Sequence, residues 1–382
     1  MKKQITSEKI PIKLWLDDID EVTLQQAKDL ANFPFAYKHI AIMPDAHPGF
    51  GMPIGGVLAT LGVVIPNAVG VDIGCGMEAV KTSITNISQD TLKNILCETR
   101  NTIPVGFEHN KEAQIWEAFN RAPSVDIIQK EIESAKRQIG TLGGGNHFIE
   151  ILKGDDGFIW ILVHSGSRNF GFKTANYFYQ KAIKISQNSK IKLPTKELSF
   201  LPIDSNEGRQ YLKAMNFCLE FAQANRDLMT EKVKKIFSGY TKATFDPSIN
   251  IHHNYAAEEE HFAKKVYVHR KGATKATKGL IGIVPGSMGT PSYIVEGLGN
   301  PESFCSCSHG AGRRLGRRQA IKSLSLEEEQ IKMKDILGAP RTKNELQEAP
   351  GAYKDIDKVM KDQEDLVKIK TKLFPLAVII GT

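Results

Sequence analysis

The segment Val71-Asp-Ile-Gly-Cys-Gly76 follows closely on a glycine- and proline-rich run, Met43-Pro-Asp-Ala-His-Pro-Gly-Phe-Gly-Met-Pro-Ile-Gly-Gly-Val57. Asp72 and Cys75 stand three residues apart in a turn, and glycine flanks the cysteine on both sides. One carboxylate and one thiolate on so short a turn can reach the same metal ion, and a thiolate can also bridge two ions. Because an Asp-x-x-Cys spacing arises often by chance, a metal site requires imidazoles from elsewhere in the chain.

The composition is that of an ordinary globular protein with a sizeable core, since 41% of the 382 residues are hydrophobic and 24% are charged. The sequence has no apolar run long enough to span a membrane, and Met1 to Glu8 lacks an apolar signal core, so we expect a cytoplasmic protein. Five cysteines, an odd number, do not indicate a disulfide framework. The net charge of +7 fits a polyanionic partner such as nucleic acid without requiring one.

Hydrophobic periodicity predicts helices and strands that alternate along the chain. Strands are expected at residues 8–16, 37–43, 57–65, 158–164, 266–274, 280–285 and 375–380. Helices are expected at residues 20–32, 89–100, 112–138 with a break at Ala122-Pro123, 208–237, 324–337 and 355–367. The sequence shows no repeat, low-complexity linker or clear boundary, and glycine-flanked motifs extend from residue 43 to 313. This pattern favours one interleaved domain over residues 1–382, of the α/β or α+β class.

Asp45 and His47 are the two chemically competent side chains of the glycine-rich run at residues 44–56. Glycine lets a backbone approach a ligand closely, so this run suits a binding site. An ordinary surface loop explains its composition equally well.

Candidate metal ligands occur at Asp72, Cys75, His147, His164 and one of His252 or His253. Three glycines precede Asn146 and His147, and His164 ends a buried strand that opens into the turn Ser165-Gly-Ser-Arg168. Each histidine alone is more often a satisfied polar residue, but five such residues beside glycine or sharp turns together favour a metal site. Thiolate, imidazole and carboxylate suit Mn²⁺, Zn²⁺, Fe²⁺ or Co²⁺, and ligand type does not select among them.

His309 lies in Ser308-His-Gly-Ala-Gly-Arg313, followed by Arg314. Its small neighbours leave room for a bulky partner, and arginines bind phosphate oxygens through paired hydrogen bonds. A neutral imidazole is a competent nucleophile toward phosphorus. The alternative is a buried turn histidine. Cys305 and Cys307 have no second cysteine pair, which favours a structural role.

In this order, the motifs closely resemble those of the RtcB-type RNA ligases over nearly the whole chain. The motifs are Asp45/His47, Asp72-x-x-Cys75-Gly, Gly-Gly-Gly-Asn146-His147-Phe-x-Glu150, His164-Ser-Gly-Ser-Arg168, His253-Asn254, Arg270-Lys271-Gly-Ala-Thr, Gly286-Ser287-Met-Gly-Thr and Ser308-His309-Gly-Ala-Gly-Arg313. The resemblance implies a single large α+β domain with mixed or antiparallel sheets surrounded by helices.

The resemblance also implies a GTP- and Mn²⁺-dependent enzyme that joins an RNA 3′-phosphate or 2′,3′-cyclic phosphate to a 5′-hydroxyl. Cys75 would bridge two Mn²⁺ ions, one of which also takes His164 and His253 while the other takes Asp72 and His147. His309 would attack the α-phosphate of GTP and carry GMP. The nucleotide contacts would come from Asn146, Glu150, Asn254, Ser287, Ser292, Gly310, Arg313 and Tyr353. Arg168 and Lys271 would bind RNA phosphates.

Two departures from the family pattern affect these expectations. Ile380 stands where the family usually has a lysine that helps hold the guanine nucleotide, which puts the base preference in question. The loop Asn67-Ala-Val-Gly-Val-Asp72 resembles bacterial members rather than the archaeal and eukaryotic tRNA-splicing branch. It indicates a divergent paralogue of the kind associated with RNA repair and with release-factor-like or activator proteins.

Three alternatives remain open from the sequence. A metal-dependent phosphoesterase would keep both metals without a histidine–GMP link, and an RNA-binding protein would have lost catalysis. A guanylyltransferase would cap 3′-phosphorylated ends with GMP and stop, which the altered C-terminus favours. Neither the physiological RNA nor the oligomeric state follows from the sequence.

Overall fold

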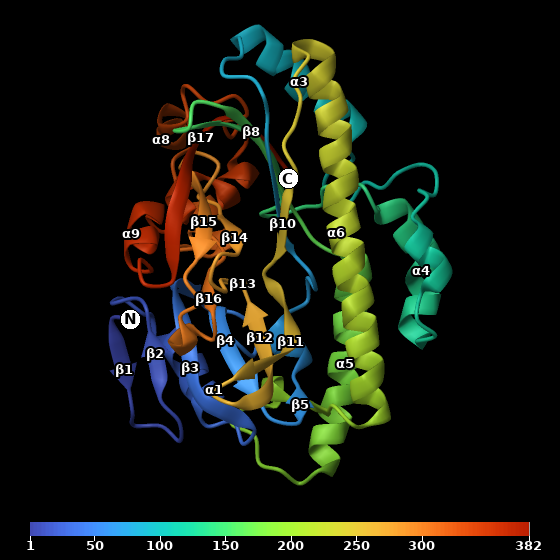
Figure 1. Cartoon of the computed structure of the whole chain (residues 1–382), viewed down its shortest axis with the longest axis vertical. Helices are drawn as coiled ribbons and strands as arrows, with labels where there is room; N and C mark the ends of the chain where they lie inside the picture. Colours follow the sequence, from blue (N-terminus) through green and yellow to red (C-terminus); the bar gives the residue numbers. More distant parts are fainter. Residues whose placement is uncertain (382) are drawn as a thin grey trace.

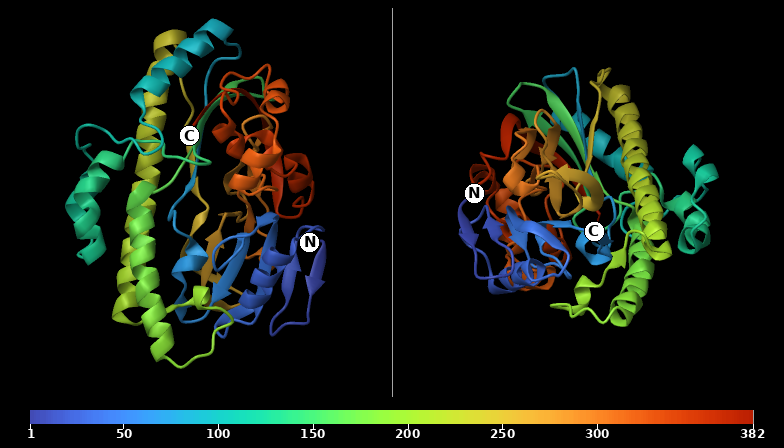
Figure 2. Two further views of the ribbon diagram at one scale, coloured as in Figure 1. Left: turned by 180° about the vertical axis from the view of Figure 1, so that it is seen from behind. Right: turned by 60° about the horizontal axis from the view of Figure 1, so that its bottom comes forward.

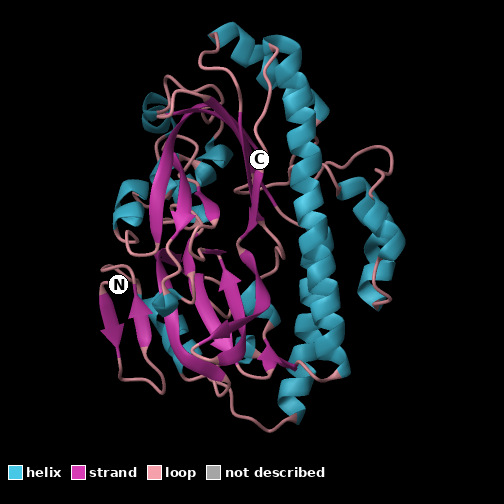
Figure 3. Cartoon of the chain, viewed as in Figure 1, coloured by secondary structure: helices cyan, strands magenta, loops and turns pink. Residues whose placement is uncertain are grey.

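Two large β-sheets form the centre of the protein, and helices cover their outer faces, as the computed structural model of residues 1–381 shows (Figures 1 and 3). The strands of the first sheet are, in spatial order, β1 (Lys3–Ile5), β2 (Ile12–Leu14), β3 (Ala36–His47), β4 (Ile54–Thr60), β12 (Lys264–Lys271) and β11 (Asn254–His261). Those of the second are β10 (Ile249–His252), β6 (Gly76–Lys81), β8 (Ile159–Ser165), β7 (Phe148–Gly154), β17 (Val367–Ile380), β15 (Ser292–Gly297) and β14 (Ile281–Val284).

Neighbouring strands in the two sheets are antiparallel except for β2 and β3, which pair in parallel. Two small ribbons complete the strands, β5 (Val63–Val64) with β9 (Leu201–Pro202) and β13 (Ala273–Lys275) with β16 (Ser306–Ser308). The structure therefore confirms an α+β fold with mixed and antiparallel sheets.

The helices lie mostly on the outside of the sheets, with the long α6 flanked by α5 and α4 on one side (Figures 1 and 2). The α-helices are α1 (Glu21–Ala31), α2 (Pro66–Val69), α3 (Gln89–Thr102), α4 (Asp126–Gln138), α5 (Arg168–Asn188), α6 (Asn206–Thr241), α7 (Arg317–Ser323), α8 (Leu326–Lys332) and α9 (Ile356–Lys361). Short 3₁₀ turns occur at η1 (Glu117–Arg121), η2 (Lys196–Leu198), η3 (Pro301–Ser303), η4 (Lys343–Glu348) and η5 (Pro350–Ala352). No helix within residues 1–381 combines the length and apolar character needed to cross a membrane.

Helix α6 shows how the sequence produces this arrangement. Its N-cap is Ser205, whose side chain accepts a hydrogen bond from the backbone N–H of Gly208. Its apolar residues recur at helical spacing, so Phe217 and Phe221 pack on Phe170 of α5. Further along, the buried α6 residues join the core beneath the seven-stranded sheet. One helix thus supports the strands that carry the candidate metal ligands.

Most expected elements are confirmed, and the differences have physical causes. The break near Ala122-Pro123 separates η1 from α4, although residues 112–116 are not helical. The strand expected at 57–65 is interrupted at Gly62, which adopts a φ of 71°. Helix α8 is shorter than the expected 324–337, and the helix expected at 355–367 ends at Lys361.

Two further predictions need correction. The strand expected at 8–16 is reduced to β2, and β3 extends to His47, so the first part of the glycine-rich run is buried sheet rather than surface loop. Helix α5 was not predicted, because the Gly/Ser-rich turn before it and its internal Gly171 obscure its start.

Candidate metal centre and active-site cavity

Four candidate ligands meet at one end of the seven-stranded sheet. They are Cys75 before β6, His147 before β7, His164 near the end of β8 and His253 after β10. The strands run antiparallel, so the start of one lies beside the end of its neighbour. The register aligns them, because Gly76 pairs with both Ser165 and His252. Of the two adjacent histidines, His253 therefore enters the site.

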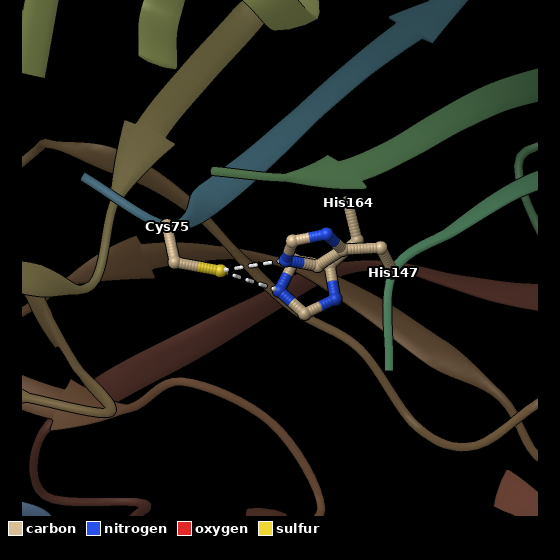
Figure 4. Close-up of side chains that lie close together, drawn as sticks. All are labelled: Cys75, His147 and His164. Atoms are coloured by element: carbon tan, nitrogen blue, oxygen red, sulfur yellow. Dashed lines mark hydrogen bonds between the residues drawn. The ribbon is translucent and has the colours of Figure 1, made fainter. Parts of the chain in front are cut away.

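The thiol of Cys75 lies at the centre of this cluster. Its Sγ atom is 3.4 Å from Nε2 of His147 and 3.3 Å from Nε2 of His164 (Figure 4). The ligand atoms of these three buried residues all lie within 4.8 Å of one another. Burial and the nearby charge of Asp72 raise the pKa of the Cys75 thiol well above its usual value, and a bound cation would lower it.

The contacts divide into two sets that share Cys75. On one side, Oδ2 of Asp72 is 3.1 Å from Nε2 of His147. On the other, Nε2 of His164 is 3.4 Å from Nε2 of His253. Two ligands that bind one metal at about 2.0–2.3 Å in tetrahedral geometry lie about 3.5 Å apart, which matches these separations. Each set could therefore supply ligands to a cation, and Cys75 belongs to both sets.

Backbone carbonyl groups orient two of the rings. Nδ1 of His147 donates to the carbonyl oxygen of Leu142 (3.0 Å), and Nδ1 of His164 donates to that of Asn146 (2.8 Å). Both rings therefore point Nε2 toward Cys75, and a neutral imidazole could bind a metal through that atom. The main chain of residues 142–146 thus fixes the orientation of both candidate ligands.

The carboxylate of Asp72 is held in place by the turn that follows β8. The backbone N–H of Ser167 donates to its Oδ1 atom at 3.1 Å. Gly166 passes so close that a Cβ atom there would lie 2.2 Å from the same oxygen. The turn Ser165-Gly-Ser therefore requires glycine at 166, where the chain approaches the candidate ligand.

His309 enters the site directly after β16, which forms the small ribbon with β13. Its Nδ1 lies 2.6 Å from Oδ2 of Asp45 in β3. Burial alone would raise the pKa of Asp45, but the charge and hydrogen bond of His309 bring it below its usual value. An ionised carboxylate can only accept, so Nδ1 of His309 carries a proton that it donates to Asp45, and Nε2 points away from this hydrogen bond.

The ring of His309 also lies against the cluster of candidate ligands, with its centroid 4.8 Å from that of His253. Gly272 borders the ring, and a Cβ atom there would lie 3.1 Å from Cε1 of His309 and 2.2 Å from Cγ2 of Ile54. Its φ of 57° also favours glycine. The nucleophile candidate and the candidate ligands thus share one site.

A cavity of about 820 Å³ opens over these groups. Among the residues expected from the sequence, those that line it are Asp72, Cys75, Asn146, His164, His253, Asn254, Lys271, Ser287, His309, Gly310, Arg313 and Tyr353. Those that do not are His147, Glu150, Ser292 and Arg168. This volume is sufficient for a nucleotide, and ligand sites commonly fall in this size range.

Arg313 and Tyr353 form one wall with Glu348, which the sequence analysis did not single out. The Arg313 guanidinium lies 2.9 Å from Glu348 and 3.2 Å from the hydroxyl of Tyr353, which in turn donates to Glu348. Glu348 is buried and also binds Arg317. A phosphate that binds Arg313 must therefore share it with an existing carboxylate.

The small polar residues have mainly local contacts. Ser287 Oγ lies 2.9 Å from Oγ1 of Thr290, and Ser292 Oγ accepts from the backbone of Gly286 at 3.2 Å. Asn254 donates to the carbonyl of Asp72 and accepts from the backbone of Gly272. Its amide joins the loop of the candidate ligands Asp72 and Cys75 to the loop beside His309.

Glu150 and Ile380 lie on adjacent strands, β7 and β17. Glu150 pairs in register with Val378, and Phe148 pairs with Ile380. Ile380 and Phe148 line the cavity, whereas Glu150 is only 2% exposed and does not line it. Burial raises the pKa of Glu150 to about 8. This wall of the cavity is apolar, with a carboxyl group beneath it.

The two residues expected to bind RNA are both partly occupied by protein contacts. Arg168 donates to Oγ1 of Thr141 and to the carbonyl of Gly106, each at 2.9 Å. Lys271 donates to the carbonyls of Phe50 (2.6 Å) and Asn67 (3.0 Å), and burial lowers its pKa to about 7. Lys271 reaches the cavity wall, while Arg168 braces the segment behind His147.

Comparison with known proteins agrees with this geometry. Residues 26–381 match the family model described as tRNA-splicing ligase RtcB. The chain belongs to the RtcB family. It is 40% identical over 397 residues to the RNA-splicing ligase RtcB of Escherichia coli (strain K12), with 96% of each chain covered. It is 32% identical to the tRNA-splicing ligase RtcB of Nanoarchaeum equitans, with 97% of this chain and 95% of the relative covered.

Proposed function

We propose that this protein is an RNA ligase that joins a 3′-phosphate or 2′,3′-cyclic phosphate end to a 5′-hydroxyl end, using GTP and two Mn²⁺ ions. Family membership and the names of the relatives support the coarser statement that it ligates RNA. The observation that carries the finer proposal is the placement of His309, whose Nδ1 is bound to Asp45 while its ring contacts His253.

In the proposed first step, Nε2 of His309 attacks the α-phosphorus of GTP. A nitrogen–phosphorus bond forms, the bond to the bridging oxygen breaks, and pyrophosphate leaves with the electron pair. Asp45 stabilises the positive charge that the ring gains, as a carboxylate does in other histidine-centred sites. Arg313 and the backbone of Gly310 lie in the cavity wall where they would face the phosphates.

In the following steps, an oxygen of the RNA 3′-phosphate takes the GMP from His309, and the RNA 5′-hydroxyl then attacks the 3′-phosphorus and releases GMP. A 2′,3′-cyclic phosphate must first be opened by water to the 3′-phosphate. The metal pair, held by Asp72, Cys75, His147, His164 and His253, would supply positive charge that neutralises phosphate oxygens and helps align the displacement. Asn146 and Ser287 lie in the cavity wall within reach of a bound nucleotide.

Incubation with GTP or ATP labelled on the α-phosphate tests this proposal. The protein, supplied with Mn²⁺, is denatured, and retained label is tested for the acid lability and base stability of a histidine phosphoramidate. Label from GTP that is absent in His309→Ala supports the first step. Label from ATP instead of GTP would mean that this protein prefers adenine, in agreement with the replacement of the family's usual lysine by Ile380. With metal binding verified, no label from either nucleotide would contradict the proposal and favour a phosphoesterase.

The joining step needs its own measurement, because a capping guanylyltransferase would also label His309. An RNA with a 3′-phosphate is mixed with a second RNA that has a 5′-hydroxyl, and the products are separated by length. A ligase gives the joined product, whereas a capping enzyme stops at RNA that carries GMP on its 3′-phosphate. An activator protein or release-factor-like partner, expected from the resemblance, would increase the joined fraction without changing its dependence on His309.

A further inference from the structure

Phe107 is an aromatic residue whose side chain is fully exposed, at 103% of the reference value. It occupies the tip of a turn in which the backbone N–H of Glu108 donates to the carbonyl of Val105 at 3.0 Å. Gly106, just before it, has a φ of 60°, which glycine adopts without strain. The local backbone therefore holds the phenyl ring outward, away from the protein.

This turn is fixed to the segment that carries the candidate metal ligands. The backbone N–H of Gly106 donates to the carbonyl of Gly143 at 2.8 Å, and Arg168 donates to the carbonyl of Gly106 at 2.9 Å. Gly143 begins the run that leads to His147. The exposed ring thus stands on a backbone that is braced on both sides, rather than on a free loop.

The same turn lies beside the edge of the cavity. Gly145, which lines the cavity, follows Gly144, and a Cβ atom at Gly144 would lie 3.7 Å from the Cα of Gly106. A Cβ atom at Gly106 would lie 3.5 Å from the carbonyl oxygen of Gly381, next to the cavity-lining Ile380. Phe107 is therefore adjacent to the rim, close to the site but not part of its wall.

This part of the rim also carries cations. Arg317 lines the cavity, and its Nη2 would lie 3.2 Å from a Cβ atom at Gly145. Arg314 lines the cavity as well. Arg317 also pairs with the buried Glu348, but its side chain remains 51% exposed. The acidic cavity residues Asp18 and Asp20 lie close enough to Lys354 to act on its charge.

We propose that Phe107 is a stacking platform for an unpaired base of the RNA, just outside the cavity in which the ends are joined. Aromatic side chains beside basic residues are the usual means of binding a single strand, because every base has a face that stacks. The arginines of the rim would hold the neighbouring phosphates. This inference rests on the proposed function only in taking RNA as the substrate.

Ile115 provides a matched control, since it is another exposed apolar residue of the same connecting segment, at 92% of the reference value. Its neighbour Gln114 donates its backbone N–H to the carbonyl of Lys136, at the end of α4. Replacing Ile115 by alanine therefore also removes an exposed apolar side chain. The backbone beside Ile115 is hydrogen-bonded to α4, whereas the backbone beside Phe107 is hydrogen-bonded to Gly143.

The test uses the Mn²⁺-loaded full chain and a single-stranded RNA with a 3′-phosphate. Phe107→Ala should weaken binding about 5- to 100-fold, the range for loss of one stacked base, while Phe107→Trp and Ile115→Ala bind as the unmodified protein does. The slope of log affinity against log salt should stay unchanged in Phe107→Ala, whereas Arg317→Ala should reduce it by about 0.7.

A second readout reports stacking directly. RNAs with 2-aminopurine at successive positions from the 3′ end should include one whose fluorescence is quenched by the protein, and Phe107→Ala should abolish that quenching. Unchanged RNA affinity and quenching in Phe107→Ala would overturn the proposal, and would assign the exposed ring to another role such as a protein contact. Labelling of His309 by GTP tests the proposed function separately, because that step does not involve RNA.

Discussion

Oδ2 of Asp45 lies 2.6 Å from Nδ1 of His309 and also accepts hydrogen bonds from the backbone N–H groups of His309 (3.1 Å) and Gly310 (3.3 Å). One buried carboxylate oxygen thus receives three donors from two consecutive residues. These bonds fix the position of the ring, its orientation and the nitrogen that carries the proton. The geometry makes Asp45 the positioning residue for His309.

Substitution Asp45→Asn should slow the labelling of His309 by GTP at least about a hundredfold. The amide retains the shape of the side chain but removes the negative charge opposite a ring that becomes positive when Nε2 bonds phosphorus. Single-turnover labelling at saturating GTP measures the rate. Asp90→Asn on α3, whose side chain is 94% exposed, is the control and should label normally. A normal rate in Asp45→Asn would exclude this electrostatic role.

Metal content should separate the two halves of the ligand cluster. His253→Ala should remove one of two bound Mn²⁺ ions and Asp72→Ala the other, while Cys75→Ala should lose both because the thiolate belongs to each set. Elemental analysis after gel filtration gives the stoichiometry, and circular dichroism checks folding. His252→Ala is the matched control, since its side chain instead bonds the carbonyl of Gly74. Equal metal loss in all three ligand variants would contradict two distinct sites.

The sequence singled out these candidate metal ligands because they lie beside glycine or in sharp turns near strand ends, a local pattern that can be read without the fold. It left His252 and His253 as alternatives, because the choice depends on the register of β10 against β6. Asp45 was noticed as chemically competent, but its partner is 264 residues away, so no local pattern connects it with His309.

The secondary structure also divides into elements that local sequence patterns predict and elements that depend on tertiary contacts. Long periodic elements such as α6 were predicted closely, since their spacing is local. Helix α5 was missed, and it starts with Arg168 at a φ of 54°, an unusual conformation that the bonds of its guanidinium to Thr141 and Gly106 stabilise. Glu348 also gave no sequence signal, because its role depends on Arg313 and Tyr353 reaching it through the tertiary structure.

Glu259 should be important for stability. It lies 2.6 Å from the fully buried Arg270 and 2.9 Å from His261. Burial alone would raise the pKa of Glu259, but His261 and Arg270 bring it far below its usual value. Glu259→Gln should reduce the free energy of unfolding by about 3–5 kcal/mol, since it leaves a buried cation without its partner.

The ion pair between Glu259 and Arg270 also predicts that the free energy of unfolding depends on pH, which urea unfolding at several pH values measures. The carboxylate stabilises the fold above its unfolded-state pKa of about 4.3, and this contribution should be lost as the pH falls below that value. Glu258→Gln, at a half-exposed neighbour, should shift stability by less than about 1 kcal/mol. A small change in the free energy of unfolding in Glu259→Gln would mean that the remaining hydrogen bonds of Arg270, to Ser306 and Phe304, are sufficient to stabilise its charge.

Glu150 should affect the pH dependence of stability in the opposite direction to Glu259, because burial raises the pKa of Glu150 to about 8. The folded protein then holds a proton that the unfolded chain releases above about pH 4.3, so stability should fall as the pH rises from there to about 8. Glu150→Gln removes this penalty, and its stability relative to the unmodified protein should increase by up to about 1.4 kcal/mol per pH unit across that interval. Urea unfolding between pH 5 and 9 measures it, with the exposed Glu133→Gln as the control.

Parallel curves for Glu150→Gln and the unmodified protein would mean that Glu150 is ionised in the folded state. The distinction bears on the nucleotide, because a carboxylate only accepts hydrogen bonds whereas a neutral carboxyl group also donates. The Watson–Crick edge of guanine offers two neighbouring donors and suits the carboxylate, while that of adenine offers a donor beside an acceptor and suits the neutral group. If Glu150 contacts the base, as the family resemblance implies, its ionisation predicts which nucleotide should label His309 beside the Ile380 wall.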